Sequence, residues 1–164
     1  MPIRLKGSCR CGKVRFTAAS HTPVPYQLCY CSICRKTAGG GGFAINIMAD
    51  TATLEVEGED SIGVFHAEIR DGSGNCETSR GERRFCNSCG TALWVFDPAW
   101  PELIHPFASA IDSDLPKAGE KTHLMLRFKA DWVEPDIGPR DQRFDDYPEE
   151  SIEEWHRKRG LWVD

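Results

Sequence analysis

Hydrophobic and polar positions alternate along much of the first three quarters of the chain, which is the pattern of half-buried β-strands. Val14 and Phe16 alternate with charged and polar neighbours, and Phe43, Ile45 and Ile47 repeat the pattern. The segment 91–96 (TALWVF) is apolar on both faces, which predicts a strand at the centre of a sheet. Further strands are predicted at Leu54 to Val56, 62–69, 103–111 and 123–128.

Two segments have helical patterns. The first is short, covers residues 32–37 and directly follows a group of cysteines. The second covers 148–159, with Pro148 suited to the first turn and Gly160 just past the end. Ile152 and Trp155 lie three residues apart there and can face the core together. The pattern predicts one mostly-β domain over residues 1–164, with the C-terminal helix lying across it.

Composition and charge narrow the class of protein. Of the 164 residues, 40% are hydrophobic and 27% are charged, as is usual for a globular protein. No apolar run approaches the roughly 20 residues of a membrane helix, and the first sixteen residues lack the apolar region of a signal peptide. We therefore expect a cytoplasmic protein with no membrane partner. The formal charge of −5 argues against a nucleic-acid partner, because such binding depends on neutralising phosphates.

The eight cysteines carry the candidate chemistry. In a chain without a leader, clustered cysteines indicate metal or redox chemistry rather than disulfides. A redox Cys-x-x-Cys is expected in a βαβ context, which the strand pattern does not predict. Metal binding is the favoured interpretation, and seven cysteines fall into three clusters: Cys9-x-Cys11, Cys29-x-Cys31-x-x-Cys34 and Cys86-x-x-Cys89.

Counting ligands divides the seven cysteines into two zinc sites. Structural zinc is tetrahedral and takes four protein ligands, and the first and third clusters together supply four. We therefore predict a closed structural zinc site made of two distant segments of the chain, with the ligands Cys9, Cys11, Cys86 and Cys89. Because structural zinc adds folding free energy directly, this site is expected to stabilise the fold.

The remaining cluster, Cys29, Cys31 and Cys34, lacks one ligand of a tetrahedron. Three protein ligands and one exchangeable position are typical of catalytic zinc. Three thiolates make zinc a weak Lewis acid, which favours an incoming sulfur ligand over activation of a hydrolytic water. The alternative is that Cys76 completes a second closed site; otherwise Cys76 is a spare surface thiol.

Four segments of the chain resemble one known family: 7–16 (GSCRCGKVRF), 29–39 (CYCSICRKTAG), 83–94 (RRFCNSCGTALW) and 144–161 (FDDYPEESIEEWHRKRGL). The family is that of the glutathione-dependent formaldehyde-activating enzymes, which also includes centromere protein V. The resemblance implies a zinc-stabilised β fold like that of methionine sulfoxide reductase B. It also implies the same division of cysteines into a structural and a catalytic zinc.

The family's activity is the addition of glutathione to formaldehyde, which gives S-hydroxymethylglutathione. Formally this is a carbon–sulfur lyase reaction run backwards. The implied partners are a small thiol such as glutathione and a small aldehyde, bound by a monomer or homodimer. Residues 39–42 (GGGG) depart from the bulkier loop expected after the middle motif, so the shape of the substrate stays open.

Glutathione has two carboxylates, so basic residues are expected near the open zinc site. Arg35 and Lys36 follow Cys34 directly and are the candidate substrate-binding residues; Arg83 and Arg84 come next. The sequence also offers His123 and His66 for protonating the aldehyde oxygen, although a structural role is the simpler interpretation of each histidine.

Two other functions remain open from the sequence. A non-catalytic zinc module that binds another protein would need a fourth protein ligand and an exposed apolar patch. The candidates for the patch are Trp155, Leu161, Trp162 and Val163, unless they pack into the domain or a dimer. A labile zinc store or sensor would need a three-thiolate site that exchanges its metal quickly.

Overall fold

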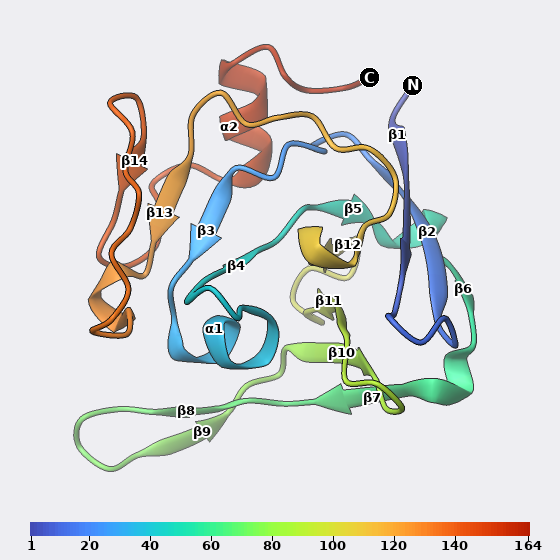
Figure 1. Ribbon diagram of the computed structural model, residues 1–164, viewed down its shortest axis with the longest axis horizontal. Helices are drawn as coiled ribbons and strands as arrows, with labels where there is room; N and C mark the ends of the chain where they lie inside the picture. Colours follow the sequence, from blue (N-terminus) through green and yellow to red (C-terminus); the bar gives the residue numbers. More distant parts are fainter.

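The computed structural model describes residues 1–164 and is built mainly of short strands, with two α-helices (Figure 1). A five-stranded antiparallel sheet lies at its centre, in the order β5-β12-β11-β10-β7. Two strands lie on each side of β11 in this sheet, which confirms the central position predicted for segment 91–96. The strands are β5 (Ala49–Asp50), β7 (Ile62–Phe65), β10 (Glu82–Cys86), β11 (Ala92–Phe96) and β12 (Leu103–Pro106).

A three-stranded antiparallel sheet, in the order β1-β2-β6, packs against the five-stranded sheet and encloses the largest core. Side chains from both sheets, among them Leu5, Leu93 and Ile104, are almost fully buried in this core. The rings of Phe16 and Trp94 meet edge to face, with centroids 5.0 Å apart. The strands are β1 (Ile3–Ser8), β2 (Arg15–Ser20) and β6 (Glu55–Glu57).

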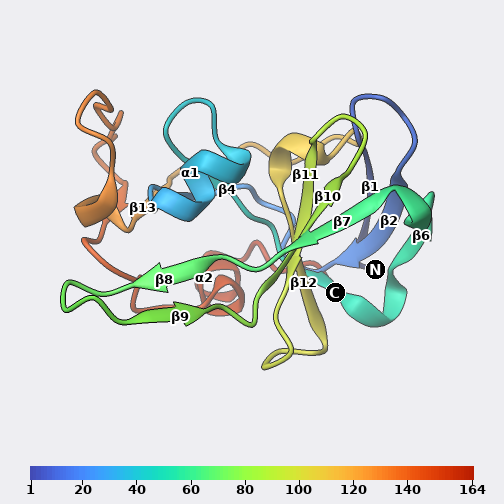
Figure 2. The same ribbon diagram turned by 90° about the horizontal axis from the view of Figure 1, so that it is seen from below.

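A third sheet supports the segment that contains the three-cysteine cluster. Its order is β14-β13-β3-β4, and β13 runs parallel to both β3 and β14. Strand β3 ends at Cys29, and the chain passes within three residues into helix α1 (Ser32–Ala38), beside strand β10 (Figures 1 and 2). The strands are β3 (Gln27–Cys29), β4 (Ala44–Ile45), β13 (Thr122–Leu124) and β14 (Gln142–Arg143).

The hairpin of β8 (Glu68–Arg70) and β9 (Cys76–Thr78) projects away from the rest of the chain (Figure 2). All six residues of the two strands are exposed. The hairpin pairs with no third strand, so its stability comes from its own ladder and from the tight turn around Asp71, whose carboxylate accepts hydrogen bonds from Ser73 and Asn75.

Helix α2 (Ile152–Lys158) packs on the third sheet through Trp155, whose ring stacks on Tyr26 with centroids 3.7 Å apart. The helix begins later than predicted. Ser151 accepts a hydrogen bond from the N–H of Glu154 and the Glu154 carboxylate accepts one from the N–H of Ser151, which makes a capping box. Pro148 therefore lies before the helix, while Gly160 lies just past its end at a φ of 65°, as predicted.

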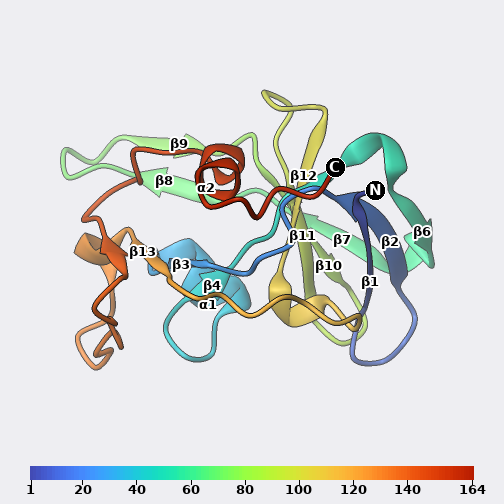
Figure 3. The ribbon, with the colours of Figure 1, turned by 90° about the horizontal axis from the view of Figure 1, so that it is seen from above.

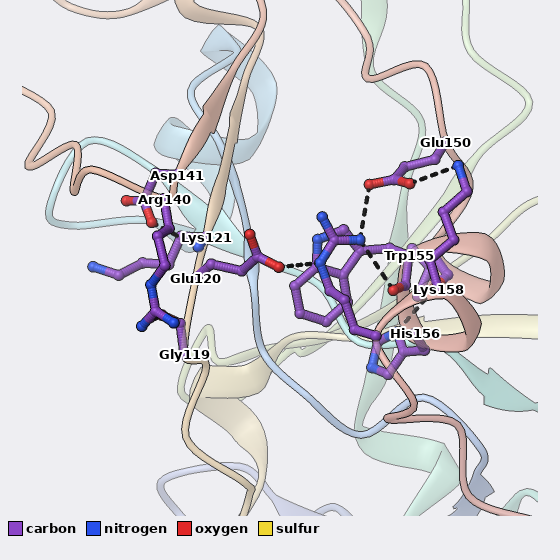
Figure 4. A network of polar contacts seen from close by, with 11 residues as sticks. Gly119, Glu120, Lys121, Arg140, Asp141, Glu150, Trp155, His156 and Lys158 are labelled. Carbon is purple, nitrogen blue, oxygen red and sulfur yellow. Dashed lines mark hydrogen bonds and ion pairs between the residues drawn. The ribbon is translucent and has the colours of Figure 1, made fainter.

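An ion-pair network joins the end of α2 to the loop before β13 (Figure 4). Arg159 pairs with Glu120 and with Glu150, and its guanidinium lies 4.4 Å from the centroid of the Trp155 ring. From there the last residues run back toward the N-terminal strand (Figure 3), where the Val163 N–H donates to the carbonyl of His21.

Three predicted strands are only partly right. Segment 62–69 divides into β7 (Ile62–Phe65) and the start of β8 at Glu68, and the other two are right only in their first halves. In segment 103–111 the strand ends at Pro106 and a 3-10 turn follows at Ala108–Ala110. In segment 123–128 the strand ends at Leu124, because Met125 takes a left-handed conformation with φ of 59° and starts another 3-10 turn.

The mostly-β class and the C-terminal helix are confirmed. The likeness to methionine sulfoxide reductase B and the single-domain boundary stay predictions. Neither α1 nor α2 is long and apolar enough to cross a membrane.

Candidate metal centres

The four cysteines assigned to a structural site come together in space. Their sulfur atoms all lie within 4.8 Å of one another, although the two pairs come from opposite ends of a long chain segment. The Cys9 and Cys11 sulfurs are 3.5 Å apart, and the Cys11 and Cys86 sulfurs are 3.7 Å apart. Tetrahedral zinc with Zn–S bonds of about 2.3 Å has S···S edges of about 3.8 Å, whereas a disulfide is about 2.05 Å long. The donor set therefore fits a tetrahedral metal ion, and all four thiols are free.

Two similar turns present these sulfurs. Gly12 and Gly90 both have a φ close to 78°, which favours glycine, and their N–H groups donate to the carbonyls of Cys9 and Cys86. The Val14 N–H donates to the Cys9 sulfur at 3.2 Å. On the other turn, hydrogen bonds from Thr91 lower the pKa of the Cys89 thiol to about 5. Amide and hydroxyl donors thus offset the negative charge that four thiolates bring together.

The second cluster consists of Cys29, Cys31 and Cys34, whose sulfur atoms also lie within 4.8 Å of one another. Strand β3 presents the first cysteine, and Cys31 is the N-cap of α1, where its sulfur accepts a hydrogen bond from the Cys34 N–H at 3.3 Å. Hydrogen bonds from the Cys29 and Cys34 side chains and from that N–H lower the pKa of Cys31 to about 2. The sulfur contacts that lower the pKa of Cys31 raise the pKa of Cys29, so among these two thiols Cys31 ionises more readily.

No fourth protein ligand joins this cluster. Cys76, the alternative fourth ligand, lies exposed on the projecting hairpin and belongs to neither group of cysteines. The chain therefore offers three sulfur donors here, and a metal held by them keeps one position for another ligand. The two clusters could both hold metal ions, and their sulfur-only donor sets are suited to zinc.

Basic side chains without acidic partners surround the three-cysteine cluster. Arg83 donates to the Cys34 sulfur at 3.6 Å and to the Thr37 hydroxyl at 3.3 Å. Arg35 is half-buried on α1, and its buried Nε has no hydrogen-bond partner. Lys36 is exposed and, like Arg35, takes part in no ion pair. In contrast, Arg84 pairs with Glu82 and is not free for a ligand.

A buried polar network supports the same cluster from behind. In the motif Cys29-Tyr30-Cys31, strand alternation turns the middle side chain away from the sulfurs, and the Tyr30 hydroxyl lies 2.8 Å from His123 Nδ1. His123 Nε2 lies 3.0 Å from the carboxylate of Asp141, which also accepts from the N–H groups of Lys121 and Gly138. The carboxylate fixes Nε2 as a donor, so in the neutral ring Nδ1 accepts from Tyr30.

This network decides the role of His123. The ring is fully buried and both nitrogens are engaged, so His123 anchors the cysteine segment and is not placed to protonate a substrate. Burial opposes ionisation of Asp141, but hydrogen bonds from Gly138 and His123 outweigh it and lower its pKa to about 2. His66 is exposed at the base of the hairpin, where its Nδ1 bonds the carbonyl of Ser79. The sequence shows each residue, but not that Tyr30 and Asp141 face the same histidine.

One exposed residue near the cluster was not predicted. Desolvation raises the pKa of the Tyr147 phenol. The negative charge of the three cysteines raises this pKa further, because Tyr147 is close enough to interact with them electrostatically. Tyr147 is 76% exposed and lies in the segment between β14 and α2. The sequence pointed to Tyr147 as a functional residue only through its position in the C-terminal motif 144–161.

The apolar C-terminal patch is not exposed as a unit. Trp155 is 1% exposed, and Trp162 stacks on His21 with ring centroids 4.8 Å apart. Val163 bonds the backbone of His21, which leaves Leu161 as the one exposed side chain of the four. These residues pack into the chain, so they do not supply the surface that a protein-binding module would need.

The sequence profile of the family described as "Glutathione-dependent formaldehyde-activating enzyme" matches residues 4–126. A protein of Halomonas elongata, whose name assigns it provisionally to the same family, is 59% identical over 157 residues, which cover 96% of this chain and 97% of that protein. A crystal structure of a Rhodobacter sphaeroides protein superimposes with a TM-score of 0.50 at 23% identity, covering 68% of this chain and 91% of that one. This last likeness concerns the fold alone.

Proposed function

The chain belongs to the family of glutathione-dependent formaldehyde-activating enzymes, and from this we propose that it is a zinc enzyme of the carbon–sulfur lyase type. Its reaction would be the addition of glutathione, or a related thiol, to formaldehyde or another small aldehyde. The observation that carries the proposal is the three-cysteine cluster, which has three sulfur donors, no fourth protein ligand and unpaired basic residues around it.

The proposed reaction balances without a redox partner. The thiol gives up its proton, its sulfur forms a bond to the carbonyl carbon, and the carbonyl oxygen takes up a proton as the C=O double bond becomes single. Zinc bound by Cys29, Cys31 and Cys34 would supply an open coordination position and favour the thiolate form of an incoming thiol. The second zinc, with Cys9, Cys11, Cys86 and Cys89, would be structural.

The chain's own residues would bind and orient the thiol. We assign Arg35 and Lys36 to the carboxylates of glutathione, because both lie on α1 next to the cluster and neither has an acidic partner. Arg83 bonds Cys34, so it would offset the charge of the three thiolates instead of binding substrate. Holding both reactants at one site would supply much of the rate by proximity.

The test is the rate at which zinc-loaded protein forms the adduct of glutathione and formaldehyde, followed by NMR exchange spectroscopy against the uncatalysed background. We expect acceleration by the parent protein and none by Cys31→Ser. Cys76→Ser is the matched control, because it removes an exposed thiol outside both clusters and should keep the parent rate.

Circular dichroism of both variants separates lost chemistry from lost fold, and Cys31→Ser should keep the parent spectrum. Arg35→Gln should raise KM for glutathione with less change in kcat. The proposal fails if the zinc-loaded parent gives no rate above background with any thiol–aldehyde pair.

A further inference from the structure

An apolar pocket of about 350 Å³ lies beside the three-cysteine cluster, between α1 and the β7–β10 edge of the central sheet. Three phenylalanines line it: Phe65 from β7, Phe85 from β10 and Phe107 from the turn after β12. Strand pairing puts Phe85 opposite Gly63, where a side chain would collide with the Phe85 ring, so the glycine leaves the ring its place in the wall. Thr37 and Arg83 form the side that faces the cysteines, and Arg84, Gly90 and Ala92 complete the lining.

Three contacts connect this pocket to the cluster. Arg83 lines the pocket and also donates to the Cys34 sulfur at 3.6 Å. Thr37 lines it too, lies one turn after Cys34 on α1, and is bonded to the same guanidinium. Phe107 packs with Cys34 in one small hydrophobic cluster, which also includes the lining residue Ala92. The pocket therefore shares its wall with the proposed reaction centre.

The other large apolar pocket has no such connection. It measures about 390 Å³, lies between the two main sheets, and is lined by residues such as Leu54, Val56 and Phe96. It shares Arg84 with the first pocket, but none of its lining residues belongs to the hydrophobic cluster around Cys34. It serves as an internal comparison for the first pocket.

The chemistry of the walls restricts the occupant. Formaldehyde has only hydrogen atoms on its carbonyl carbon and needs no pocket, whereas 350 Å³ is within the range of small-ligand sites. The peptide of glutathione is polar and doubly acidic, and its proposed partners, Arg35 and Lys36, lie on α1. An apolar wall of aromatic rings suits instead a hydrocarbon substituent on the aldehyde.

We propose that this pocket binds the carbon chain of the aldehyde, so that the preferred electrophile is an apolar aldehyde of several carbons and not formaldehyde. The proposal rests on the proposed function, since it names the substrate class of the same site. The reaction is unchanged: the thiol sulfur bonds the aldehyde carbon and the oxygen takes the proton. Each buried methylene is worth about 0.8 kcal/mol of transfer free energy, which corresponds to about a fourfold gain in kcat/KM.

The first test compares formaldehyde, acetaldehyde, butanal and hexanal with glutathione and zinc-loaded protein. Among acetaldehyde, butanal and hexanal, whose carbonyl carbons are similarly reactive, we expect kcat/KM to rise by about fourfold for each added methylene until the pocket is full. Formaldehyde has a more reactive carbonyl and reports the reaction without a carbon chain. Ala92→Leu, which fills the pocket, should remove most of this gain. Val56→Leu fills the other pocket to a similar degree and should preserve the gain. A kcat/KM that does not rise with chain length, in a protein that does accelerate the formaldehyde reaction, would overturn the inference alone.

The second test does not depend on activity. Hexanamide has the chain of hexanal without its electrophilic carbon, and saturation-transfer NMR on the zinc-loaded protein reports its contact with side-chain protons. We expect a signal that Ala92→Leu weakens at least fivefold and Val56→Leu does not, while acetamide gives none. Absence of hexanamide binding, or equal binding by both variants, contradicts the pocket assignment even if no aldehyde reacts.

Discussion

The four-cysteine and three-cysteine clusters offer the same kind of donor atom, but the chain reaches them in opposite ways. The first joins two turns that are 75 residues apart, and it links β1 and β2 to the hairpin of β10 and β11. The second comes from six consecutive residues, 29–34, at the junction of β3 and α1. A metal in the first cluster closes a long loop, whereas a metal in the second closes almost none.

Their surroundings differ as well. Backbone amides and the Thr91 hydroxyl stabilise the sulfurs of the four-cysteine cluster, and no cationic side chain bonds them. The three-cysteine cluster instead has Arg83 on a sulfur, and the unpaired Arg35 and Lys36 beside it. In the four-cysteine cluster the chain supplies all four ligands of a tetrahedral metal ion. In the three-cysteine cluster the chain supplies three ligands and nearby basic side chains without acidic partners, and a ligand-binding site needs both features.

The largest expected effect comes from removing a ligand of the four-cysteine cluster. Cys86 is fully buried, and structural zinc contributes roughly 10–16 kcal/mol in small zinc domains, as much as the whole stability of a typical domain. We therefore expect Cys86→Ser to lose cooperative thermal unfolding, whereas Cys31→Ser keeps it. Circular dichroism melts of the zinc-loaded proteins measure both. Equal modest losses in the two variants would show that the clusters do not divide into structural and open sites.

The next effect concerns the network behind the three-cysteine cluster. Asp141→Asn removes a charge that accepts three hydrogen bonds, and we expect a loss of about 2 kcal/mol in the free energy of unfolding at pH 7. Urea titration measures this loss. Metal should also leave the three-cysteine cluster faster while the four-cysteine cluster is unaffected, because Tyr30 and His123 brace only the former.

The pH dependence of this contribution follows from its sign. The pKa of Asp141 is lowered to about 2 in the folded protein, so its stabilisation is present above the unfolded pKa of about 3.9 and is lost as the pH falls toward 2. The difference between parent and Asp141→Asn should therefore stay constant from pH 5 to pH 7. A difference that shrinks within that range would mean that another group titrates in the network.

A smaller effect is expected at Arg83. Arg83→Met keeps much of the length of the side chain but removes its charge from the Cys34 sulfur, and we expect metal to leave the three-cysteine cluster about threefold to tenfold faster. Competition with a chromophoric chelator measures the two release rates separately. Arg80→Met is the matched control, since Arg80 pairs with Asp97 and should leave both rates unchanged. Faster release in the control would indicate a general charge effect.

The smallest expected effect is at Cys76. Because it lies exposed on the hairpin, outside both clusters, Cys76→Ser should change neither the number of metal ions bound nor their release rates. Metal content by plasma emission spectroscopy gives the stoichiometry, which we expect to be two per chain. A loss of one metal would assign Cys76 as the fourth ligand and close the second site.

The sequence predicted the clusters well because ligand spacing is a local property. Counting thiolates was enough to divide Cys9, Cys11, Cys86 and Cys89 from the other three, and the structure brings each group together. Local capping decided the error at α2: the Ser151–Glu154 capping box starts the helix at Ile152, four residues after the predicted start at Pro148. The sequence contains this boundary as the pattern Ser-x-x-Glu at 151–154.

Contacts between distant segments could not be predicted in the same way. Nothing near Tyr30 indicates that its hydroxyl bonds a histidine 93 residues later, since that contact depends on the parallel pairing of β3 and β13. The apolar pocket likewise needs α1, β7, β10 and the turn after β12 at once. Alternation predicts which side chains share a face of a strand, but not which faces meet.

The separation of the two clusters along the chain also sets the order in which they can form during synthesis. Residues 29–34 leave the ribosome early and can gather their sulfurs without waiting for the rest of the chain. The Cys9 and Cys11 sulfurs must wait until Cys89 has emerged, about 4 to 16 seconds later at roughly 5–20 residues per second. When zinc is scarce, the three-cysteine segment of the nascent chain would therefore be the first to bind a zinc ion. The other cluster would be filled only later, when the turn that carries Cys86 and Cys89 has been made.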